Sequence, residues 1–166
     1  MDFFAHGLWT SVVYWKERRR DWLWAIFFGV MPDFVAFGPF FIEEFREHAT
    51  LFRHHEVSLI PTYVYMMYNL GHSLVVFGLV FTLVWWLRGR RVWWPLGGWA
   101  LHVLLDIPTH SIEFFGTPFL FPFASYRFDG IPWSHPWFLT INWVALVIVY
   151  STLVVRKHQQ RRVVTK

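Results

Sequence analysis

The chain has 166 residues, of which 55% are hydrophobic, 22% aromatic and only 16% charged. About a quarter of the residues of an ordinary soluble domain are charged, so the composition argues against that class and for a membrane protein. The 12 Trp residues agree, because indole rings favour the boundary between hydrocarbon and lipid headgroups. The absence of Cys excludes disulfides and thiolate metal sites, so any bound metal is held by nitrogen and oxygen atoms.

Apolar segments along the chain predict the helices. The first, 3–15, is too short to cross a membrane, and we expect it to be a retained helix and not a signal peptide. Four more segments reach or nearly reach the ~20 residues that a transmembrane helix needs: 22–42, 57–87, 92–110 and 137–155. We therefore predict an all-α polytopic membrane protein, a single domain over 1–166, with four long transmembrane helices and a short N-terminal helix. Whether 22–42 spans fully or is broken at Pro32 stays open.

Basic residues predict the orientation of these helices. Of the 15 Lys and Arg residues, 12 lie in three clusters, at 16–20, at 88–91 and in the tail 156–166. If the helices alternate in direction, all three clusters fall on one side, which the positive-inside rule makes cytoplasmic. Because the clusters adjoin membrane segments, their expected partners are membrane lipids and not nucleic acid.

Ionisable residues are few inside the apolar segments, and they predict a functional site. Counted at 1.5 Å per helical residue, Asp33, His72, His102 and Asp106 fall in one slab of the membrane, and His6 lies near it. A carboxylate in hydrocarbon needs a partner or a polar cavity. Imidazoles with carboxylates and no thiolate suit a divalent cation, with zinc as the first choice and manganese as the second.

The stretch "HVLLDIPTH" carries His102, Asp106 and His110 at intervals of four, which share one helix face. Pro108 is expected to bend the last turn of this helix, so His110 is interpreted as a separate rim histidine near the outer surface. Alternatives without a metal stay open: His102 and Asp106 could form a buried pair, and His72 could only hold helices together through interhelical hydrogen bonds.

Five short blocks carry a resemblance to a known family: "HGLWT" (6–10), "GVMPDF" (29–34), "GHSLVVF" (71–77), "HVLLDIPTH" (102–110) and "GTPFLFPFASYRF" (116–128). By these blocks, which occur in the same order, the chain resembles the YdjM-like bacterial inner-membrane metal-dependent hydrolases. More distantly, it is similar to the zinc-dependent phospholipases C. The resemblance implies a location in a prokaryotic plasma (inner) membrane. It also implies a site made by His6, Asp33, His72, His102 and Asp106, with Ser73 and Thr109 as supporting polar residues.

Three positions depart from the family pattern. Val35 stands where a second acid often follows the first, and Met67 and Tyr68 replace a His–Arg pair. These changes remove ligands or phosphate-binding charge, which puts a two-metal site in doubt.

The expected function is a metal-dependent hydrolase that uses metal-activated water on a lipid-like phosphoester or ester. Asp33 is the candidate catalytic base. No G-x-S-x-G motif is present, which argues against a serine esterase. The alternative is a non-catalytic membrane protein. Its His/Asp cluster would bind a metal, hold a haem between His72 and His102, or serve only the structure of a scaffold or transporter.

Overall fold

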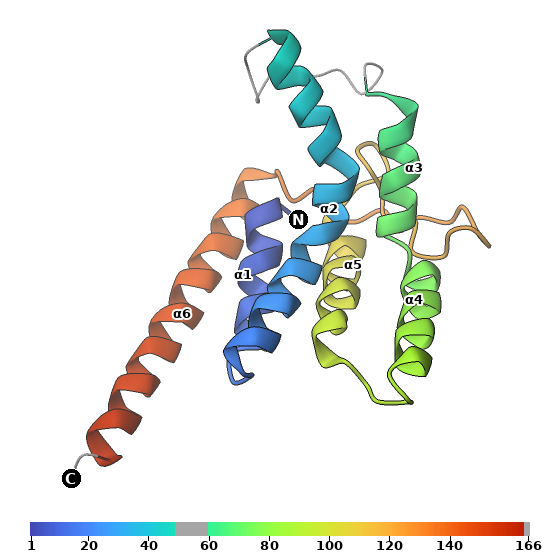
Figure 1. The fold of residues 1–166 in the computed structure, drawn as a ribbon. Coiled ribbons are helices and arrows are strands. Elements are labelled where there is room, and N and C mark those ends of the chain that lie inside the picture. Colours follow the sequence, from blue (N-terminus) through green and yellow to red (C-terminus); the bar gives the residue numbers. More distant parts are fainter. Residues whose placement is uncertain (49–59, 165–166) are drawn as a thin grey trace.

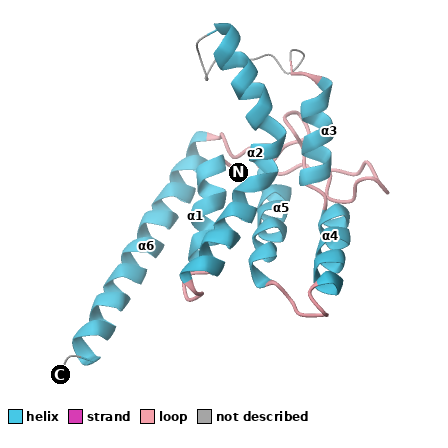
Figure 2. Ribbon diagram, viewed as in Figure 1, coloured by secondary structure: helices cyan, strands magenta, loops and turns pink. Residues whose placement is uncertain are grey.

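The computed structural model describes residues 1–48 and 60–164, and within them the chain is helical (Figure 1). The elements are α1 (Phe3–Val13), α2 (Arg19–His48), α3 (Thr62–Gly71), α4 (Leu74–Leu87), the 3-10 helix η2 (Trp94–Leu96), α5 (Gly97–Thr109) and α6 (Pro136–Val164). This described part contains no β-strand (Figure 2). The predicted all-α fold is confirmed.

Helix α2 is the centre of the molecule and packs against α1, α3 and α5 (Figure 1). Small residues make this close packing possible. A Cβ atom on Gly98 of α5 would lie 2.2 Å from the backbone oxygen of Ala25 in α2, and one on Gly29 would lie 2.3 Å from Oγ1 of Thr10 in α1. Glycine at helix crossings lets backbones approach closely, which is how membrane helices commonly associate. The middle of α2 is thus drawn against two neighbours.

The prediction of four long transmembrane helices is wrong for the described residues. Two helices are long and apolar enough to cross a membrane, α2 over Arg19–Glu47 and α6 over Pro136–Gln160. A third would be α3 and α4 taken together, which are bent by 58°. The expected span 92–110 fails because its helix α5 has only 13 residues and starts after the turn of η2 at Trp94–Leu96.

The expected span 57–87 is not one straight helix, because Ser73 starts a new helix inside it, and its residues 57–59 lie outside the described part of the chain. The Ser73 hydroxyl oxygen accepts hydrogen bonds from the backbone N–H groups of Val75 and Val76, both at 3.1 Å, which is the geometry of a helix N-cap. The same hydroxyl donates to the carbonyl oxygen of Phe121 at 2.5 Å. His72 therefore lies in the break between two helices, between the end of α3 and the start of α4.

Helix α2 is not broken at Pro32. It continues through both Pro32 and Pro39 as far as His48, and so extends beyond the predicted 22–42 at both ends. Proline removes one backbone donor and disturbs the preceding turn without always ending a helix. The first helix ends at Val13, two residues before its predicted limit, and α6 continues into the basic tail as far as Val164.

The segment between α5 and α6 folds back over the end of α5. Backbone N–H groups of Gly130, Ile131 and Trp133 donate to the carbonyl oxygens of His110, Pro108 and Thr109, at 2.8, 2.9 and 3.0 Å. The last carbonyls of a helix have no partner within the helix, so these bonds satisfy them. The segment thereby covers the end of the bundle at which His110 lies.

Candidate metal centre

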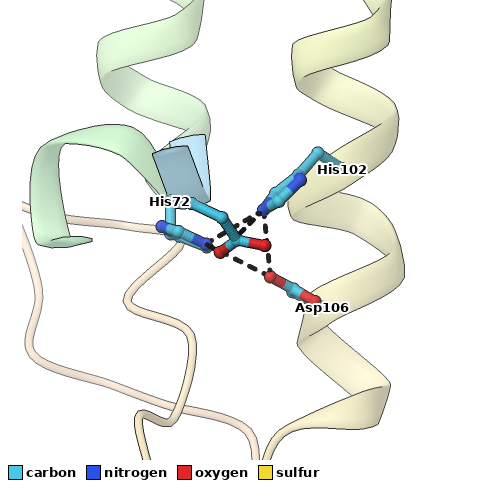
Figure 3. A group of neighbouring side chains, drawn as sticks. His72, His102 and Asp106 are labelled. Atoms are coloured by element: carbon cyan, nitrogen blue, oxygen red, sulfur yellow. Dashed lines mark hydrogen bonds and ion pairs between the residues drawn. The ribbon is translucent and has the colours of Figure 1, made fainter. Parts of the chain in front are cut away.

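Asp33, His72, His102 and Asp106 converge from three places in the fold. Asp33 comes from the middle of α2, His72 from the break between α3 and α4, and the other two from successive turns of α5. Each of these residues offers one potential ligand atom, and the four atoms all lie within 4.8 Å of one another. Figure 3 shows the side chains of His72, His102 and Asp106 pointing toward one another. The group could hold a metal ion.

The tautomers of the two central histidines are set by backbone carbonyls. Nδ1 of His102 lies 2.7 Å from the carbonyl oxygen of Gly29, and Nδ1 of His72 lies 3.0 Å from that of Tyr68. A carbonyl oxygen only accepts hydrogen bonds, so each Nδ1 must carry the hydrogen, and Nε2 of the neutral ring then presents a lone pair. A metal-ligating histidine usually donates such a hydrogen bond from the ring nitrogen that does not bind the metal, and the bond fixes the orientation of the ring.

The two Nε2 atoms face each other at 3.0 Å. Oδ2 of Asp106 lies 3.2 Å from both of them, and Oδ1 of Asp33 lies 3.3 Å from Nε2 of His72 and 3.7 Å from Nε2 of His102. Two lone pairs and two carboxylates in so small a space repel one another unless a positive charge lies among them. A proton on an imidazole or a metal ion would supply such a charge between the rings, and the N-terminal amine of Met1 supplies one at the other oxygen of Asp106.

The hydrogen-bond geometry at Asp106 fits a metal ion, whereas a proton on one imidazole would be shared between the two Nε2 atoms. Oδ2 of Asp106 has no aligned hydrogen-bond donor among the described residues, although two histidine nitrogens are only 3.2 Å away. A hydrogen bond weakens steeply when its donor points away from the acceptor. A metal ion between the four groups needs no such alignment, because each ligand points at the ion and not at its neighbour.

The other oxygen of Asp106 faces a second group of side chains. Oδ1 lies 2.9 Å from Nε2 of His6 and 3.2 Å from Nδ1 of His110, and it also contacts the backbone nitrogen of Met1. The His6 ring stacks on that of His102, with centroids 3.7 Å apart. His6 thus contacts the centre through Asp106 and His102 and lies outside the group of four.

His110 lies closer to the centre than the sequence suggested. It was expected at the outer rim, beyond a bend at Pro108, but it is buried and contacts Asp106. The reason is that α5 continues through Pro108 to Thr109, so the i,i+4 register between Asp106 and His110 is kept.

The two supporting residues serve the backbone. Thr109 donates its hydroxyl to the carbonyl oxygen of Leu105 in its own helix at 2.8 Å. Ser73 caps α4 and so fixes the break that holds His72.

Sequence reasoning missed the groups that orient the imidazoles. The Tyr68 ring stacks on His72 with centroids 3.7 Å apart, and its hydroxyl donates to the carbonyl oxygen of Phe115 at 2.6 Å. The carbonyl oxygen of Gly29 also belongs to the centre. Every residue type has a backbone carbonyl, so the sequence gives no signal for this contact. The position of Tyr68 four residues before His72 is the one sequence signal for this contact.

Comparisons with known proteins give no further guide to the centre. No protein-family model, no curated protein and no solved structure matches this chain.

Proposed function

We propose that the protein is a membrane-embedded metal-dependent hydrolase, as its resemblance to the YdjM-like family implies. The observation that carries the proposal is the pair of Nε2 atoms, on His72 and His102, that lie 3.0 Å apart and 3.2–3.7 Å from the oxygens of two carboxylates. Two His and two Asp ligands suit zinc first and manganese second. The three basic clusters support an inner-membrane orientation with that side cytoplasmic, since α2 begins, α4 ends and α6 ends at the same end of the bundle (Figure 1).

Asp33 differs from the other members of the centre in two ways. It is 14% exposed, whereas His72, His102 and Asp106 are fully buried. Its carboxylate also reaches farther, 3.3 and 3.7 Å from the two histidine nitrogens. Asp33 is therefore the ligand most easily displaced, and it can accept a proton from water at that position. The metal would supply polarisation of the substrate and acidification of that water.

The surroundings of Asp33 support a lipid-like substrate. Asp33 lies at the midpoint of the candidate span Arg19–Glu47, and its neighbours Phe34 and Val35 are 61% and 41% exposed. Apolar side chains exposed at that depth face hydrocarbon. A phosphoester or ester of a membrane lipid can reach Asp33 from within the bilayer, whereas a strongly hydrated substrate would have to leave water.

A second candidate, a structural metal site, is favoured by burial. Three of the four ligands are fully inaccessible, and structural sites are closed by four protein ligands. Such a centre would hold α2, α5 and the break between α3 and α4 together without turnover. The haem alternative fits less well, because Nε2 atoms 3.0 Å apart leave no room for a porphyrin plane between them.

Asp33→Asn separates catalysis from structure. We expect this variant, purified in detergent, to keep its metal, because the Asn amide oxygen can still serve as the weak fourth ligand beside His72, His102 and Asp106. Its hydrolysis of fluorogenic phosphatidylglycerol or phosphatidylcholine analogues should fall at least about 100-fold, the scale of general-base catalysis. His135→Ala, at an exposed surface position, is the control and should remain active. If the wild type binds zinc or manganese stoichiometrically but hydrolyses neither lipid nor a soluble 4-nitrophenyl phosphodiester, the structural alternative holds.

A further inference from the structure

A basic groove lies at the end of the molecule where α2 begins and α6 ends. It encloses about 660 Å³ between the turn that joins α1 to α2 and the last turns of α6. Four basic side chains line it against a single acidic one, Glu17, and they are Lys16, Arg19, Arg156 and Lys157. This volume is in the range of small-molecule sites, and the excess of positive charge selects an anion.

The groove arises because α6 separates from α1. The two helices are joined near the middle of α6, where Trp9 donates its indole N–H to Asn142 at 2.8 Å and the hydroxyls of Ser11 and Tyr150 lie 2.7 Å apart. Beyond Tyr150, α6 runs past the α1–α2 turn and extends away from it (Figure 1). Leu153 lines the groove among the basic residues. In a bilayer such an open groove would be filled by lipid.

The level of the groove matches that of lipid headgroups. The two candidate spans have Arg19 as first residue and Gln160 as last, and both residues line the groove. Trp15 and Trp22 also line it, as expected of indole rings at a membrane interface. Nζ of Lys157 lies 5.6 Å from the ring centroid of Trp15, so the cation is held over the aromatic face, where it can meet a phosphate.

We propose that this groove binds one anionic phospholipid, with its headgroup phosphate among Arg19, Arg156 and Lys157 and an acyl chain along Leu153. The lipid would join α6 to α1 and α2 at the end where protein contacts are sparse. The site is at the opposite end of α1 from His6 and is independent of the metal centre.

The test uses the full chain purified in detergent, with phosphatidylglycerol and phosphatidylcholine as probes and native mass spectrometry as readout. We expect retained phosphatidylglycerol to exceed phosphatidylcholine at least tenfold. Arg19→Gln with Lys157→Gln should weaken phosphatidylglycerol binding about 30-fold, since each basic group near an anionic surface contributes about fivefold. Arg18→Gln with Arg91→Gln removes the same charge outside this groove and should change binding less than twofold.

Three results would overturn the proposal: equal retention of the two lipids, equal losses in the two double variants, or displacement of phosphatidylglycerol by millimolar inorganic phosphate, which would identify a soluble anion as the ligand. Metal content reports folding, and it should be the same in wild type and both double variants. If the groove variant does not fold, Lys157→Gln alone is the test, because this side chain is exposed. Its affinity for phosphatidylglycerol should fall about fivefold, and an unchanged affinity would also overturn the proposal.

Discussion

The centre of the bundle and its peripheral helix α6 are built by opposite rules. Where α2 crosses α5 and the α3–α4 break, His72, His102 and Asp106 are fully buried, and backbones approach so closely that only glycine fits at Gly98. Helix α6 is apolar, and only 11% of its candidate membrane-spanning stretch is buried. Hydrophobicity thus marks α2 and α6 as long and apolar enough to cross a membrane, whereas the buried polar groups lie where the central helices converge. Changes at the centre should alter metal binding and folding, and changes in α6 should alter neither strongly.

The largest effect on metal binding is expected from His102→Ala. This change removes a ligand nitrogen, the bond to Gly29 and the stack on His6. Loss of groups that only support ligands weakens metal affinity 10–100-fold, so loss of a ligand should weaken it at least about 100-fold. Isothermal titration with zinc measures the change, and His135→Ala is the control. Equal affinities in the two variants would show that the histidines at the centre are packing residues.

A large effect on stability is expected from Gly98→Ala, because the new Cβ would lie 2.2 Å from the carbonyl oxygen of Ala25. Backbone must shift to accept it, which destabilises by about 1–3 kcal/mol. Gly78→Ala in α4 is the matched control, since no atom lies within 4 Å of its Cβ position. It should be neutral or stabilising by up to about 1 kcal/mol. Unfolding of both variants in mixed micelles measures the difference in their stability. Equal stabilities would contradict the prediction.

The helical nature of the chain and the members of the centre could be predicted from the sequence, but the breaks in its helices could not. Asp33, His72, His102 and Asp106 were grouped by counting depth along apolar segments, and the structure brings these four together. The break at Ser73 depends on the carbonyl of Phe121, which is 48 residues away. Hydropathy cannot register such a contact. It equally cannot show that α5 starts only after η2, or that it continues through Pro108.

Ser73→Ala should have an intermediate effect on both readouts. The change removes the N-cap of α4 and the bond to Phe121, so we expect about 1 kcal/mol of destabilisation. Because Ser73 fixes the break that holds His72, zinc affinity should fall about tenfold, as for other groups that orient a ligand. Thr82→Ala removes a hydroxyl that bonds only within α4, to Gly78, and is the control. Unchanged zinc affinity in Ser73→Ala would show that the break is set elsewhere.

The smallest effect is expected from Tyr150→Phe in α6. It removes the hydroxyl contacts to Ser11 and to the carbonyl oxygen of Leu8, at 2.7 and 3.1 Å. Hydrogen bonds between membrane helices contribute about 0.6 kcal/mol on average, so stability should fall by about that amount. Zinc affinity should not change. A clear loss of zinc in this variant would mean that α6 helps to form the centre.

Metal content of the purified protein tests the central claim most directly. Elemental analysis after dialysis should find about one zinc or manganese ion per chain in the wild type and almost none in Asp106→Asn, a change that preserves shape and removes the charge nearest both imidazoles. The same content in the two proteins, or no divalent metal in a wild type that zinc fails to stabilise, would contradict the account.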